Sequence, residues 1–85
     1  MTAADELRRA VSLAMAGDWP AAHEIAQRHE GDEIADWLHA VIHTIEGDTG
    51  NARYWYRRCG RLDRASNAPA AELEAILASL SEPLT

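Results

Sequence analysis

The residues best suited to chemistry in this chain are two histidines and a glutamate. His39, His43 and Glu46 lie at positions i, i+4 and i+7, which fall on one side of a helix. Two histidines one turn apart can bind Zn²⁺, and a carboxylate one turn further along is an acceptable third ligand. Zinc sites usually take ligands from several elements, and no HExxH pattern occurs. The sequence therefore predicts structural histidines and no cofactor, and it leaves these three residues as the candidate ligands if a metal does bind.

The surroundings of the two histidines can be predicted in two ways. The apolar stripe of the same helix points away from His39 and His43, whereas an internal repeat aligns them with positions that are usually buried. A central helix packed on two sides reconciles both predictions, with the imidazoles hydrogen-bonded between helices. A polar pocket that unites His23 with His39 and His43 would favour a small-ligand or metal site.

The single cysteine, Cys59, could act as a nucleophile if a histidine activated it, and His29 is its repeat equivalent. Cys59 lies on an apolar stripe, however, which is typical of an inert buried thiol. No loop suited to an oxyanion hole accompanies it, so we expect no catalytic residue and no enzyme activity. One cysteine cannot form an internal disulfide, which fits a reducing, cytoplasmic location.

A short basic segment interrupts an otherwise acidic chain. Residues 1–52 carry ten acidic residues and three arginines, whereas residues 53–64 carry five arginines and Asp63. The formal net charge is −6, which argues against nucleic acid or an anionic membrane as the main partner. Helical spacing assigns Trp55 and Tyr56 of this segment to the core.

The other residues of the basic segment are candidate binding residues, namely Arg53, Tyr54, Arg57 and Arg58. They are interpreted either as solvated side chains near a helix C-terminus, where cations are favoured, or as a surface that holds carboxylates or a phosphate. The second interpretation predicts docking to an acidic partner or a weak homodimer. In the dimer the arginines would face the acids of a second copy at Glu30, Asp32, Glu33 and Asp36.

Glycine and helical periodicity divide the chain into five expected helices in a single all-α domain. The 85 residues suffice for one compact core, and no segment alternates with the period of a strand. Gly-Asp pairs at 17–18, 31–32 and 47–48 are suited to end one helix and begin the next. The expected helices span about residues 3–16, 19–30, 32–46, 49–59 and 69–81.

A shift of thirty residues superimposes the first half of the chain on the second. The repeat predicts two antiparallel helical hairpins, at about residues 3–30 and 32–60, closed by the helix at 69–81. The spacing of small and aromatic residues resembles tetratricopeptide and Sel1-like helical repeats. That resemblance rests on Ala10, Gly17, Trp19 and Ala22 in the first unit and on Ala40, Gly47, Ala52 and Tyr56 in the second. It implies a protein-interaction module.

A second resemblance lies in the amino-acid sequence of short segments within residues 17–61. The segments His23-Glu24-Ile25, Trp37-Leu38-His39-Ala40, Glu46-Gly47-Asp48 and Asn51 to Arg58 are similar to a family of small uncharacterised bacterial proteins. The resemblance implies a bacterial domain and adds no activity.

Together these patterns predict a non-enzymatic interaction or scaffold module of the helical-repeat type. Trp19 and Trp37 are candidate partner-binding residues, because tryptophan is enriched at interface hot spots. Two alternatives remain open: a small-ligand or metal-binding bundle that uses His39, His43 and Glu46, and an arginine-led nucleotide or nucleic-acid binder. An exposed apolar groove would favour the module, and a continuous positive strip from Arg53 to Arg64 would favour the nucleotide binder.

Overall fold

The computed structural model describes residues 2–80, and these form an all-α domain, as expected. The expected helices are confirmed, with ends within two residues of the predicted ones. Among the described residues there is no strand, and a short 3₁₀ turn that the sequence did not predict follows the fourth helix. The elements are α1 (Ala3–Met15), α2 (Trp19–Arg28), α3 (Glu33–Glu46), α4 (Thr49–Arg58), η1 (Leu62–Arg64) and α5 (Pro69–Leu80).

The two hairpins share one turn geometry, which the Gly-Asp pairs produce. Gly17 and Gly47 adopt φ values of 93° and 84°, in the left-handed region that favours glycine. The next residues, Asp18 and Asp48, accept hydrogen bonds from backbone N–H groups of the following helix at 3.3 Å in both cases. Each hairpin therefore consists of a helix, a Gly-Asp turn and a second helix, and the thirty-residue repeat itself stays a prediction.

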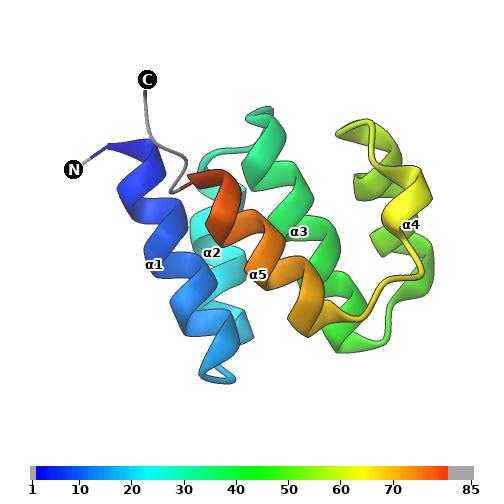
Figure 1. Cartoon of the computed structure of the whole chain (residues 1–85), viewed down its shortest axis with the longest axis horizontal. Coiled ribbons are helices and arrows are strands. Elements are labelled where there is room, and N and C mark those ends of the chain that lie inside the picture. Colours follow the sequence, from blue (N-terminus) through cyan, green and yellow to red (C-terminus); the bar gives the residue numbers. More distant parts are fainter. Residues whose placement is uncertain (1, 81–85) are drawn as a thin grey trace.

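Helix α3 lies at the centre of the arrangement. It contacts α2 on one side and α4 on the other, and it also contacts α1 and α5. Figure 1 shows α5 crossing the face that α1 and α3 form, with α4 at one end of the molecule. Because α3 is enclosed by the other helices, eight consecutive residues, Ala35 to Ile42, are buried. This confirms the expected central helix packed on more than one side.

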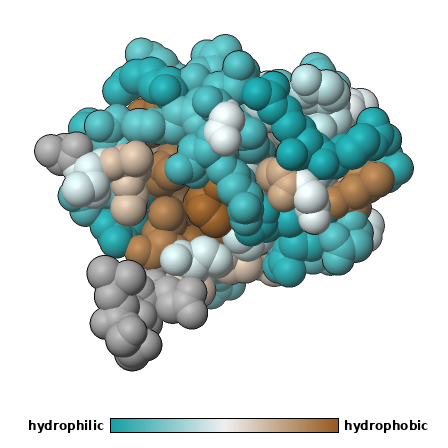
Figure 2. All heavy atoms as spheres, turned by 90° about the horizontal axis from the view of Figure 1, so that it is seen from above, coloured by the Kyte–Doolittle hydropathy of each residue, from teal (hydrophilic) through white to brown (hydrophobic). Residues whose placement is uncertain are grey.

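The outer surface is hydrophilic over most of its area. Seen from above, its largest hydrophobic area lies near the middle, and smaller hydrophobic areas lie closer to the edges (Figure 2). Single apolar residues on a surface are ordinary, so only larger groups of them point to a binding function. None of the described helices is long and apolar enough to cross a membrane.

A buried carboxylate fastens α5 to the second hairpin. Glu72 is 1% exposed, and it accepts hydrogen bonds from Trp37 Nε1 and Tyr56 OH, both at 3.0 Å. The Arg64 guanidinium donates through Nε at 3.1 Å and through Nη2 at 2.8 Å, and Asn67 Nδ2 donates at 3.3 Å. Every donor comes from a different part of the chain, so one side chain joins α3, α4, η1 and α5.

Burial of Glu72 would raise its pKa, but the hydrogen bonds from Arg64, Trp37, Asn67 and Tyr56 outweigh burial and lower it. The charged form therefore stabilises the fold. That stabilisation is fully present above the unfolded-state pKa of 4.5 and is lost as the pH falls through the lower folded-state pKa.

The variant Glu72→Gln keeps the shape of the side chain and removes the charge that Arg64 requires. At pH 7 we expect the free energy of unfolding to fall by about 3 kcal/mol, as for other broken buried ion pairs. The difference between wild type and variant should shrink below pH 4.5. Urea denaturation of both proteins at stepwise pH measures it, and contributions from other groups cancel in the difference. A difference that stays constant down to pH 3 would contradict the role of the charge.

Candidate metal centre

Three histidines from both hairpins meet between α2 and α3. His23 of α2 and His39 of α3 place their Nε2 atoms 2.9 Å apart, and His43 lies one turn further along α3. One ligating nitrogen from each of the three residues lies within 4.8 Å of the other two. The structure therefore brings together the three histidines that the sequence analysis grouped as a possibility, with His23 in the place considered for Glu46.

The helices position the three rings against one another. His39 and His43 stack with their centroids 4.9 Å apart, as residues at i and i+4 of one helix can. His23 meets both rings edge-on, with centroid distances of 4.5 Å to His39 and 5.5 Å to His43. Its ring reaches them because α2 packs directly against α3.

His39 is the innermost of the three histidines. It is 3% exposed, and its ring stacks on Trp55 of α4 with a centroid distance of 3.9 Å. Its Nδ1 atom is buried without any hydrogen-bond partner, which costs about 1–3 kcal/mol for a polar group in a protein interior. Burial, and then the nearby His23, His43 and Arg58, lower the pKa of His39 to about 4. The ring is therefore neutral near pH 7, with a lone pair free to bind a metal.

Glu46 orients His43. The distance from Nδ1 of His43 to Oε1 of Glu46 is 2.8 Å, so this carboxylate accepts from the ring. A carboxylate on one ring nitrogen fixes the tautomer and leaves the other nitrogen, Nε2, for the cluster. Glu46, a candidate third ligand in the sequence, thus bonds to a ring of the cluster and is not one of its three ligating groups.

The arrangement fits a transition metal with nitrogen ligands. Zinc-nitrogen bonds of about 2.0–2.1 Å in a tetrahedral site require nitrogens roughly 3.3 Å apart. The closest pair in the cluster, 2.9 Å apart, would have to separate slightly to share an ion, and all three ligating atoms lie within 4.8 Å of one another. The unpartnered nitrogen of His39 would be satisfied if it, rather than Nε2, were the ligating atom.

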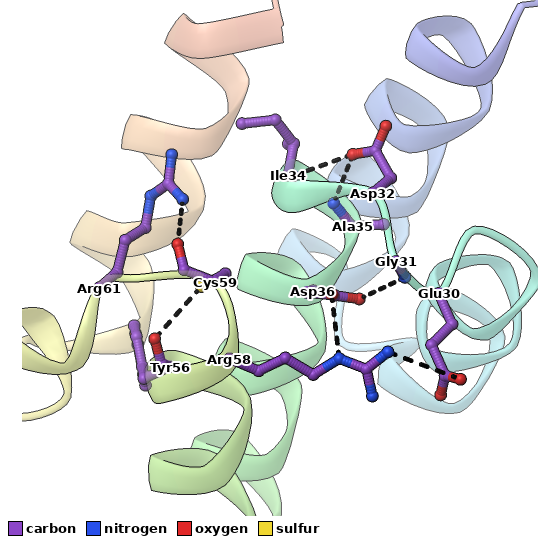
Figure 3. Close-up of polar contacts among 10 residues, drawn as sticks. All are labelled: Glu30, Gly31, Asp32, Ile34, Ala35, Asp36, Tyr56, Arg58, Cys59 and Arg61. Carbon is purple, nitrogen blue, oxygen red and sulfur yellow. Dashed lines mark hydrogen bonds and ion pairs between the residues drawn. The ribbon is translucent and has the colours of Figure 1, made fainter.

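Arg58, one of the candidate binding residues of the basic segment, forms ion pairs within its own chain. Its Nε lies 3.6 Å from Asp36, a carboxylate on α3 that is 3% exposed, and its Nη2 lies 4.0 Å from Glu30 (Figure 3). The second oxygen of Asp36 accepts from the N–H of Gly31 at 3.1 Å. Arg58 therefore pairs with two of the acids that were expected to meet it on a second copy. The weak homodimer stays a prediction, and it would rest on the remaining arginines.

Two more arginines of the basic segment also have partners inside the protein. Arg61 donates to the carbonyl of Cys59 at 2.9 Å (Figure 3). It also lies 2.7 Å from Glu33, and Arg64 binds Glu72. Arg61 and Arg64 also lie over the Trp37 ring, at 4.4 and 5.2 Å from its centroid. The expected positive strip is therefore interrupted by acids. The candidate residues Arg53, Tyr54, Arg57 and Arg58 are all exposed, and Arg58 is ion-paired.

The burial of the tryptophan and cysteine candidates differs from what their predicted roles require. Trp37 is 4% exposed and bonded to Glu72, so the expectation that it contacts a partner is wrong. Trp19 is half-buried against the core. Cys59 is half-buried, not fully buried, and its thiol donates to the Tyr56 carbonyl at 3.5 Å, while burial raises its pKa. Its repeat equivalent, His29, lies 3.1 Å from Glu6 instead, so no Cys-His pair forms among these residues.

Comparisons of the chain with family models, with curated proteins and with solved structures found no match. The resemblances to helical repeats and to small bacterial proteins therefore stay predictions. The case for a function rests on the geometry of the described residues.

His39→Leu tests whether His39 is a structural residue. Because the buried Nδ1 has no partner, an apolar side chain of similar volume should leave the metal-free protein as stable as wild type, or stabilise it by about 1 kcal/mol. Urea denaturation in a chelator measures this. A loss of more than about 2 kcal/mol would show that the His23–His39 hydrogen bond holds the fold together.

Proposed function

We propose that this protein is a small helical domain that binds one divalent transition-metal ion, zinc in the first instance, through His23, His39 and His43. The observation that carries the proposal is the meeting of three imidazoles from two hairpins, with ligating atoms within 4.8 Å. The sequence argued against a metal because its candidate ligands lay on one helix. His23 supplies a candidate ligand from a second helix, α2.

The chemistry of the donors selects the class of metal. Neutral imidazoles suit Zn²⁺, Cu²⁺ and Ni²⁺, whereas Mg²⁺ and Ca²⁺ prefer oxygen ligands. The one thiol in the described structure, Cys59, donates to a backbone carbonyl and is not part of the cluster. Cu²⁺ should bind more tightly than Zn²⁺ in a direct comparison, following the general order of divalent metals.

Metal binding would also join the two hairpins. His23 belongs to the first hairpin, and His39 and His43 belong to the second. An ion held by all three ties α2 to α3 in the folded state and has no such site in the unfolded chain. Its binding free energy therefore adds to the stability of the fold.

A helical interaction module is the second candidate function, and a separate feature supports it. A hollow of about 440 Å³ lies between α1, α3 and α5, and Met15 on its rim is 46% exposed. Its lining is mostly apolar and consists of Ala14, Met15, Ile45, Pro69, Ala70, Leu73 and Glu74. An apolar side chain of a partner would fit there, and both functions can coexist because the hollow shares no residue with the histidine cluster.

Zinc titration of the metal-free protein tests the leading proposal. We expect one ion per chain by calorimetry, and zinc at 100 times its dissociation constant should stabilise the fold by about 2.7 kcal/mol. His39→Ala and His43→Ala should each weaken binding at least tenfold. His29→Ala is the matched control, because His29 lies beside Glu6 and outside the cluster.

Two results would overturn the proposal. One is the absence of saturable zinc binding by the folded wild-type protein. The other is equal weakening by His29→Ala and by the cluster variants, which would indicate non-specific binding to surface histidines. Circular dichroism of each variant shows whether it has folded.

A further inference from the structure

We infer that the metal in this site keeps one coordination position for an external ligand, a water or a small monodentate anion. The inference rests on the proposed metal site and concerns what that site can bind. Three separate observations support it: the number of protein ligands, the way the cluster opens to solvent, and the charge around it.

The cluster supplies three ligands among the described residues, and the nearest other candidates already have partners. Glu46 accepts from His43 Nδ1 at 2.8 Å. Asp48 caps α4 by accepting from the Asn51 N–H at 3.3 Å and from Asn51 Nδ2 at 2.6 Å. A tetrahedral ion bound by three histidines therefore has a fourth position to fill. Zinc sites with three protein ligands are those that hold a water or a substrate.

The cluster is closed on one side and open on the other. Trp55 stacks on His39 and shields the innermost ring, which is almost fully buried. His23 and His43 are both partly exposed, and the side chain of His43 is 14% accessible. An external ligand would therefore reach the ion from the side of these two rings. The narrow exposure suits a ligand of a few atoms.

The local charge favours an anion in the fourth position. Three neutral imidazoles leave the double charge of the ion uncompensated by its protein ligands. Arg58, whose guanidinium lies 4.8 Å from the centre of the Trp55 ring that stacks on His39, is itself paired with Asp36 and Glu30, so the positive charge that attracts an anion is that of the ion. A water bound to such an ion loses a proton far more readily than bulk water does. The expected external ligands are hydroxide and small oxygen anions, and azide is a convenient probe.

Cobalt-substituted protein titrated with azide tests the inference. Co²⁺ in a four-coordinate nitrogen site gives visible absorption bands that respond to a change of ligand. We expect a shift of these bands that saturates at one azide per bound cobalt. The matched variant Asp48→Asn should bind cobalt and azide as wild type does, because Asp48 is assigned to capping α4.

Each outcome bears on a different part of the account. If cobalt binds but its spectrum does not respond to azide, the fourth position is filled by the protein and the inference is wrong, although the metal site stands. A spectrum that first responds to azide in Asp48→Asn would identify Asp48 as that fourth ligand and would also overturn the inference. If neither cobalt nor zinc binds, the proposed function itself fails.

Discussion

The enclosure of α3 by the other four α-helices is the constraint on which the rest of the structure depends. A helix packed in this way has no free side for polar residues, so each polar side chain in its middle must be buried. Asp36, Trp37 and His39 are all nearly inaccessible, and each finds its partner on a different neighbour. Asp36 pairs with Arg58 of α4, Trp37 donates to Glu72 of α5, and His39 meets His23 of α2. These three polar contacts link α3 to α4, α5 and α2.

The three contacts differ in how many of their buried polar atoms have hydrogen-bond partners. That difference distinguishes contacts that hold the fold together from a group that could bind a ligand. Glu72 accepts from four side chains, and Asp36 has both a guanidinium and a backbone N–H. His39 shares one nitrogen with His23, and its other nitrogen has no partner. Proteins rarely leave a buried polar atom unpaired, and sites that bind a ligand are a recognised exception. The histidine cluster is thus the polar group in the core with the least complete set of hydrogen-bond partners, and this is one reason to propose a ligand there.

The sequence predicted the elements well because each has a local cause. The Gly-Asp pairs set the hairpin turns, and helical periodicity set the lengths of the helices, so the elements could be predicted without coordinates. Trp55 and Tyr56 were assigned to the core from their spacing from Ala52, and both are buried.

The contacts between elements could not be predicted in the same way. Glu72 lies beside Leu73 in the most apolar helix of the chain, and nothing local says that its partners are Trp37, Tyr56 and Arg64. For the same reason Trp37 was predicted to lie on a partner surface, although its indole N–H donates to Glu72 inside the core. His23 could join His39 and His43 only once α2 was known to pack against α3. A glutamate one turn before a buried apolar residue, such as Glu72 before Ile76, is the one sequence signal that could have indicated a buried network.

A crystal structure of the zinc-soaked protein, with data collected on both sides of the zinc absorption edge, is the most direct test of the metal centre. The account predicts one strong anomalous peak within about 2.0–2.1 Å of a ring nitrogen of each of His23, His39 and His43. A well-ordered structure with no peak between these rings, or with zinc only on surface residues such as His29, would contradict it.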